Sequence, residues 1–103
     1  MFRINVEKDI SFSEKERVVE KIRDTTAVLI AVVKLLPGQE IAKHVTNAKV
    51  SILINSGQVR LAFNEKEIFL DRNDFITIDK DKEMCVKNIS ADTSTFIITK
   101  APN

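Results

Sequence analysis

The sequence predicts an all-β fold, a sandwich or barrel of about eight to ten short strands. Apolar residues recur at every second position along most of the chain, which is the period of a strand. Turn-prone residues interrupt this pattern at intervals of about 8 to 12 residues. The chain has 103 residues, 44% hydrophobic and 30% charged, as expected for one globular domain.

The N-terminal part, residues 1–25, is where a helix competes with strands. Ser13 and Glu16 have the spacing of a capping box, which would begin a helix over residues 13–24. The apolar residues of this stretch form only a thin helical stripe, and a strand, a turn and a second strand fit them about as well. We favour strands in residues 1–25.

The run AVLIAVV, residues 27–33, is apolar on both of its faces when it is read as a strand. Such strands are covered on both sides, so we expect this one in the middle of a sandwich or at a subunit contact. Pro37-Gly38 then forms a turn, and a short extended run that contains His44, the only histidine, follows it.

The rest of the chain alternates clearly. Residues 49–55 place Val50, Ile52 and Ile54 on one face, and the next run, 58–64, alternates in the same way. A tight hairpin is predicted where this run ends. The remaining predicted strands are 67–71, 74–79, 84–89 and 93–100.

Composition excludes several classes of function. Sixteen basic and fifteen acidic residues give a net charge of +1, so we expect no nucleic-acid partner and no attraction to an anionic membrane. The longest apolar run is far shorter than the roughly 20 residues that span a bilayer. The N-terminus, MFRINVEKDI, is charged where a signal peptide is apolar, which favours a cytoplasmic location. A single cysteine, Cys85, rules out an internal disulfide and a cysteine-based zinc cluster.

The stretch PGQEIAKHVTNAKVSILINSG, residues 37–57, resembles the first conserved motif of the cupin family of small jelly-roll barrels. That motif consists of a glycine, a His-x-His pair, a glutamate and a closing glycine. Gly38, His44 and Gly57 stand at their positions, whereas Thr46 replaces the second histidine and Val50 replaces the glutamate.

The second cupin motif fits without insertion but with little of its chemistry. It consists of a glycine, a Pro-x-Gly, a histidine and an asparagine. At those positions this chain has Asn73, Asp79, Asp81, Met84 and Asn88, of which only Asn88 keeps its residue type.

The resemblance covers residues 26–100 and implies a jelly-roll, or double-stranded β-helix, barrel like those of small single-domain cupins. Residues 1–103 would then form one domain, with N-terminal strands in 1–25 ahead of the barrel. The resemblance also implies a homodimer, and the doubly apolar run described above favours one too.

In many cupins the two histidines, the glutamate and the third histidine bind one metal ion, and only His44 remains of these four. A catalytic transition-metal site needs about three nitrogen, oxygen or sulfur ligands. Met84 offers a soft thioether, and Cys85 points away from His44 if Met84 points inward. Glu40 shares strand parity with His44 and is expected to be able to approach it. We therefore expect no cofactor, with a transition metal bound through His44 as the alternative.

Strand parity also predicts the residues that line the barrel. They are His44, Thr46, Val50, Ile52, Leu61, Phe63, Met84, Val86 and Phe96, followed by Ile98. Either these side chains fill the barrel as a solid core, or they leave a cavity for a small, mostly apolar ligand. In the second case His44 and Thr46 would orient that ligand by hydrogen bonds.

Two functions follow. The first is a metal-free, non-catalytic cupin module that binds a small molecule or a partner as a homodimer. The second is a divergent metal-dependent enzyme, an isomerase or oxygenase, that uses His44. The sequence has no converging pair of carboxylates, no Ser-His-Asp arrangement and no glycine-rich phosphate loop, so we assign no catalytic residue.

Overall fold

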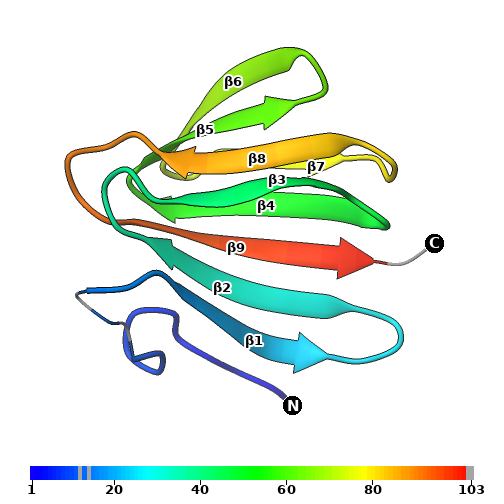
Figure 1. Ribbon diagram of the computed structural model, residues 1–103. Helices are drawn as coiled ribbons and strands as arrows, with labels where there is room; N and C mark the ends of the chain where they lie inside the picture. The colour runs from blue at the N-terminus through cyan, green and yellow to red at the C-terminus, as the bar shows by residue number, and fades with distance from the viewer. Residues whose placement is uncertain (12, 14, 102–103) are drawn as a thin grey trace.

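The computed structural model describes residues 1–11, 13 and 15–101, and it confirms the all-β prediction. This part of the chain contains no helix, and its nine strands form two antiparallel sheets (Figure 1). One sheet has the order β1-β2-β9-β4-β7, and the other has the order β3-β8-β5-β6. The strands are β1 (Val18–Asp24), β2 (Leu29–Leu35), β3 (Glu40–Val45), β4 (Lys49–Ser56), β5 (Gln58–Phe63), β6 (Lys66–Asp71), β7 (Phe75–Ile78), β8 (Glu83–Asn88) and β9 (Ser94–Ala101).

The core lies between the two sheets and is built from the inward rows of their strands. Alternate residues are buried along most of β4, β5, β8 and β9, as the alternation of the sequence predicts. Each such aliphatic side chain contributes roughly 1.5–3 kcal/mol by leaving water. The buried cluster consists of Val33, Leu35, Val50, Ile52, Ile54, Val59, Leu61, Leu70, Ile78, Met84, Val86, Phe96 and Ile98.

Strand β2 is covered on both faces, as its sequence predicts. Val33 and Leu35 point into the core. Val32 and Lys34 point to the opposite side and are also buried. The Lys34 ammonium donates a hydrogen bond to the backbone carbonyl of Ser13 at 2.9 Å, so the cover on this side comes from the same chain. Strand β2 therefore gives no reason of its own for a subunit contact.

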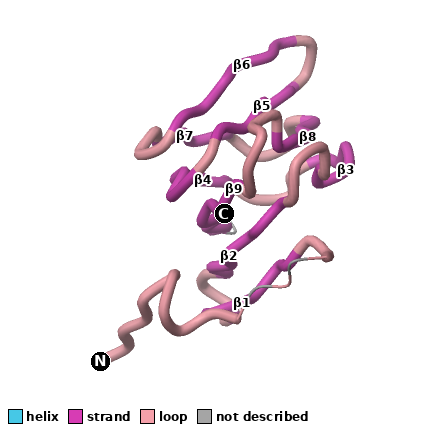
Figure 2. The backbone as a smooth tube through the Cα atoms, turned by 90° about the vertical axis from the view of Figure 1, so that its left-hand side faces the viewer, coloured by secondary structure: helices cyan, strands magenta, loops and turns pink. Residues whose placement is uncertain are grey.

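The described residues before Val18, called the N-terminal segment below, lie beside β1 and β2 (Figure 2). Ile10 of this segment is buried, and the Arg23 guanidinium of β1 lies 5.2 Å from the centre of the Phe2 ring. Because Arg23 pairs with Ile30, it is on the same face as Val32. The segment therefore covers the outer face of the five-stranded sheet at its β1–β2 end.

In the described part of residues 1–25, β1 is the one strand, where we expected strands along the whole region. The Ser13 hydroxyl accepts hydrogen bonds from the backbone N–H groups of Lys15 and Glu16 at 3.1 and 3.2 Å. This is the local bonding of a capping residue, but the element that follows is the strand β1 and not a helix. The preference for a strand over a helix at residues 18–24 is confirmed.

A buried polar network closes one end of the barrel around Asn88, which is 1% exposed. Its amide nitrogen donates to the carbonyls of Leu35 and Asp92, both at 2.9 Å. Its amide oxygen lies 2.8 Å from each of the hydroxyls of Ser90 and Ser94 and accepts the Ser90 N–H at 2.9 Å. The side chain thus ties the end of β2 to the β8–β9 connection.

Gly57 lies against this network, in the turn between β4 and β5. The Ser94 hydroxyl accepts the N–H of Gln58 at 3.1 Å, so the turn is attached to β9. Gly57 has a φ of 81°, and a Cβ there would collide with the Ser94 hydroxyl and lie 2.8 Å from both Cα and Cβ of Ser94. Only a glycine fits this place.

The predicted hairpin after β5 is confirmed: β5 pairs with β6 through a two-residue loop, Asn64-Glu65. Asn64 has a φ of 52°, in the left-handed region that asparagine tolerates better than most residues.

In the described residues no helix is long and apolar enough to cross a membrane.

Candidate functional site

A β-bulge in β3 decides which residues of that strand face the interior. Ile41 pairs with Val86 and His44 pairs with Met84, so β3 takes three steps where β8 takes two. The extra residue places Ile41 and His44 both on the inner side. The prediction that Glu40 shares a face with His44 is wrong, because the parity argument assumes an unbroken strand.

His44 is half-buried and lies directly opposite Met84. Its ring Nδ1 is 3.0 Å from the carbonyl oxygen of Ala42. A carbonyl can only accept, so Nδ1 carries the proton of this bond. In the neutral ring Nε2 then keeps its lone pair, and Met84, with its thioether, is the residue that pairs with His44 on the neighbouring strand. His44 and Met84 thus offer two soft or borderline donors.

Thr46, expected to offer its hydroxyl to a ligand, uses it within the fold. Thr46 is 2% exposed, and its hydroxyl donates to the carbonyl of Asp79 and accepts the N–H of Lys82, both at 3.2 Å. Its backbone N–H donates to the carbonyl of Lys82 at 2.9 Å, and its carbonyl accepts the N–H of Asp81 at 2.7 Å. Thr46 therefore fastens the β3–β4 connection to the turn between β7 and β8.

The remaining two positions of the cupin ligand set are part of the core. Val50 is fully buried opposite Ile78, and Met84 is 2% exposed. The described residues include no group of three or more His, Cys, Asp and Glu side chains that could hold a metal ion. Valine has no donor atom and the Thr46 hydroxyl is already bonded, so this donor set does not fit the metal site of the metal-binding cupins.

The expected lining residues meet between the sheets, and most of them are packed tightly. Val50, Ile52, Leu61, Met84, Val86, Phe96 and Ile98 belong to the buried cluster, and Phe63 packs against it. An open hollow of about 260 Å³ lies beside Phe63, and of the expected set only Phe63 lines it. Its other lining residues are Asn64, Lys66, Thr77, Ile78, Asp79 and Lys82.

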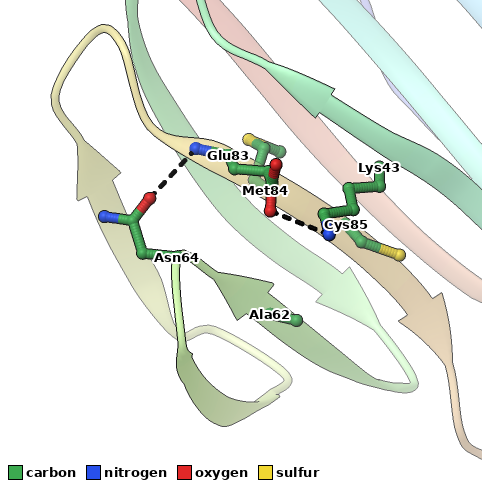
Figure 3. A pocket seen from close by; sticks show the side chains of 6 residues that line it. All are labelled: Lys43, Ala62, Asn64, Glu83, Met84 and Cys85. Atoms are coloured by element: carbon green, nitrogen blue, oxygen red, sulfur yellow. Dashed lines mark hydrogen bonds and ion pairs between the residues drawn. The ribbon is translucent and has the colours of Figure 1, made fainter.

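A second hollow, of about 150 Å³, lies on the outer face of the four-stranded sheet (Figure 3). It forms over the small side chain of Ala62, between the neighbouring strands β5 and β8. The Lys43 ammonium lies 2.9 Å from a Glu83 carboxylate oxygen at its rim, and the Asn64 side chain accepts the Glu83 N–H at 3.3 Å. The parity of Met84 and Cys85 indicated an outward cysteine, but no sequence signal indicated this hollow.

Cys85 is on this outer face, as its parity relative to Met84 predicts. Its thiol donates to a Glu40 carboxylate oxygen at 3.5 Å. Burial raises the pKa of the Cys85 thiol, and the hydrogen bond to Glu40 and its negative charge raise it further, whereas Arg60 and Lys87 act in the opposite direction. A thiol with a raised pKa is a poor nucleophile near neutral pH.

We expect Glu40→Gln to lower the pKa of the Cys85 thiol, because the substitution removes a carboxylate charge that disfavours the thiolate. The thiolate fraction near neutral pH then rises, and Cys85 reacts several-fold faster with an aromatic disulfide reagent. The matched variant Arg60→Gln removes a positive charge and should slow the same reaction. Equal rates in the two variants would contradict the assignment of these charges to Cys85.

No protein-family model matches the chain. Among curated proteins, an uncharacterized protein of Methanocaldococcus jannaschii is 29% identical over 101 residues, which is 95% of this chain and 87% of the relative. The crystal structure of that archaeal protein has been solved, and it is described as an RmlC-like cupin family protein with a double-stranded β-helix fold. It superposes with a TM-score of 0.81 at 27% identity, over 95% of this chain and 93% of the other.

This chain is a small cupin-fold protein. Two further solved structures superpose on this chain at lower identity. A cupin superfamily protein of Desulfitobacterium hafniense has a TM-score of 0.83 at 14% identity, over 91% of this chain and 84% of its own. A protein of Thermus thermophilus has a TM-score of 0.87 at 19% identity, over 99% and 98% of the two chains.

The cupin comparison also explains which motif residues this chain keeps. Gly57 and Asn88 build the closed end of the barrel, and Gly38 turns the chain into β3 with a φ of 82°. Among the motif positions that hold other residue types here, Thr46, Val50 and Met84 stand where metal-binding side chains would be, and Asn73, Asp79 and Asp81 stand at the glycine and proline positions of the second motif. The chain keeps the two glycines of the first motif and the asparagine of the second, and of the four metal-ligand residue types it keeps only His44.

Proposed function

We propose that this protein is a cytoplasmic, metal-free and non-catalytic cupin module that binds a small molecule or a partner as a homodimer, with its barrel as a rigid scaffold. One observation carries the proposal: the positions of the family's metal ligands are occupied by side chains that complete the fold. Val50 and Met84 fill the core, and the Thr46 hydroxyl bonds a neighbouring turn. A tightly packed interior leaves binding to the outer surfaces.

The proposal predicts that metal ions neither copurify with the protein nor stabilise it. The melting temperature should be the same with and without added Mn²⁺, Fe²⁺, Zn²⁺ or Cu⁺, because a ligand that binds only the folded state raises it. Elemental analysis of the purified protein gives the metal content directly.

The alternative function is a divergent metal-dependent cupin enzyme of isomerase or oxygenase type. The observation that favours it is the pairing of His44 with Met84, since an imidazole nitrogen and a thioether together suit Cu(I). It requires about one metal ion per chain in the wild type and its loss in His44→Ala. That result would overturn the metal-free proposal.

A further inference from the structure

The two ends of the barrel differ in how they are closed. The network around Asn88 closes the end where β2 finishes and β9 starts. At the opposite end, on the right of Figure 1, β2 starts and β9 finishes. A hollow of about 210 Å³ lies at this opposite end, outside the packed core, and it is lined by Thr25, Leu29, Asn47, Ala48 and Lys100.

Lys100 reaches this hollow from the inner face of its sheet. It pairs with Leu29 on one side and with Val50 on the other, and Val50 belongs to the buried core. Directly paired residues lie on the same face of a sheet, so the Lys100 side chain starts inward between two aliphatic neighbours. Lys100 is half-buried there. A charged group in such a place is normally paired.

The Lys100 ammonium has no such partner in the part of the chain that the structure describes. No carboxylate there forms an ion pair with it, and no hydrogen bond holds it. Asp24, the acidic residue of the same row, is separated from Lys100 by Leu29, and its carboxylate lies 3.8 Å from the Lys21 ammonium. The hollow therefore presents a positive charge that the described residues leave uncompensated.

The other lining residues supply one further polar group and an apolar wall. The Thr25 hydroxyl is used within its turn, where it donates to the carbonyl of Val28 at 3.2 Å and accepts the Val28 N–H at 3.1 Å. The exposed Asn47 amide makes no hydrogen bond within the described residues. Leu29 and the buried Ala48 are aliphatic. A ligand would thus meet an ammonium, an amide and an apolar wall.

We propose that this hollow binds a small monocarboxylate with a short apolar chain. This inference names a ligand class for the small-molecule binding proposed above and rests on that proposal. The carboxylate accepts a charge-assisted hydrogen bond from Lys100, and the Asn47 amide can donate a second one. The chain of the ligand lies against Leu29 and Ala48.

Charge and size both favour this class of ligand. One ammonium balances the single charge of a carboxylate, whereas a phosphate group carries nearly two charges near neutral pH. A water occupies about 30 Å³ in the liquid, so the hollow has room for a ligand about as large as seven waters. Butyrate is of this size and serves as the probe.

The first test uses the wild type alone and compares three probes by nuclear magnetic resonance. We expect butyrate to shift the backbone amide signals of Leu29 and Ala48 saturably, with a dissociation constant in the millimolar range. Butyramide has the same shape without the charge, and it should bind about 10-fold more weakly or worse. Acetate keeps the charge but lacks the apolar chain, and it should also bind more weakly than butyrate.

The second test removes the charge of the protein. Lys100→Gln should raise the dissociation constant of butyrate by about 10-fold or more. Lys49→Gln is the matched control, because Lys49 lies at the same end of the sheet but points to the opposite face. It should change the dissociation constant by less than about twofold, since its charge does not face the hollow. Circular dichroism checks that both variants are folded.

The possible outcomes are distinct. Butyramide that binds as well as butyrate, butyrate binding that Lys100→Gln leaves intact, or no saturable shift with any probe would each overturn this site. The proposed function would still stand in these cases, because it does not depend on this hollow. Metal content and the sedimentation velocity of the wild type decide its metal-free and homodimer parts separately.

Discussion

Gly57→Ala is expected to lower the free energy of unfolding by about 2 to 5 kcal/mol. A left-handed φ costs a residue with a Cβ roughly 1–2 kcal/mol. The new methyl group would also displace Ser94 and leave buried polar groups without partners, at roughly 1–3 kcal/mol. Urea unfolding followed by circular dichroism measures the change.

Gly38→Ala is the matched control for this prediction. Gly38 has nearly the same φ, 82°, but no atom lies within 4 Å of the position of an added Cβ. Its substitution should therefore cost only the backbone term of about 1–2 kcal/mol. Equal losses in the two variants would show that the close approach of Ser94 to Gly57 does not matter.

Asn88→Asp should cost about 3–5 kcal/mol at neutral pH, as expected for an uncompensated buried charge. The aspartate has nearly the same shape, but its carboxylate would place an oxygen against the carbonyls of Leu35 and Asp92, where the amide now donates. As the pH falls, the carboxyl group takes up a proton and can donate to one of these carbonyls. The deficit relative to the wild type should therefore shrink toward acid pH.

The control for this second prediction is Asn47→Asp, in the exposed turn between β3 and β4. It introduces the same charge without burying it, so it should change stability by less than about 0.5 kcal/mol. The measurement is urea unfolding of both variants and the wild type at several pH values. A deficit in Asn88→Asp that does not depend on pH would contradict the placement of the amide against two carbonyls.

The sequence was sufficient to predict the strands and their inward rows, because burial on one face of a strand leaves a period of two. It was also sufficient for the cupin resemblance, since Gly38, Gly57 and Asn88 keep the spacing that the backbone requires. It did not predict the bulge in β3, because a single extra residue leaves no periodic signal. The error in the position of Glu40 follows directly from that bulge.

The sequence predicted that β2 is covered on both faces, but it did not predict that the N-terminal segment provides the outer cover. The N-terminal segment follows no strand period, and it is held by a lysine–carbonyl bond, a few apolar contacts and a stacked arginine. Such contacts leave no pattern in the order of residues. The hollow beside Cys85 was missed for a similar reason, because it forms where Ala62 is small relative to its neighbours on the next strand.

The N-terminal segment makes the folding unit larger than the stretch that carries the cupin motifs. A fragment limited to residues 26–100 would lose β1, the hydrogen-bonding partner along one edge of β2, together with the residues that shield Val32. Its exposed edge and bare valine face would favour aggregation over a monomeric barrel. The stretch that carries the cupin motifs and the part of the chain that completes the five-stranded sheet therefore have different boundaries.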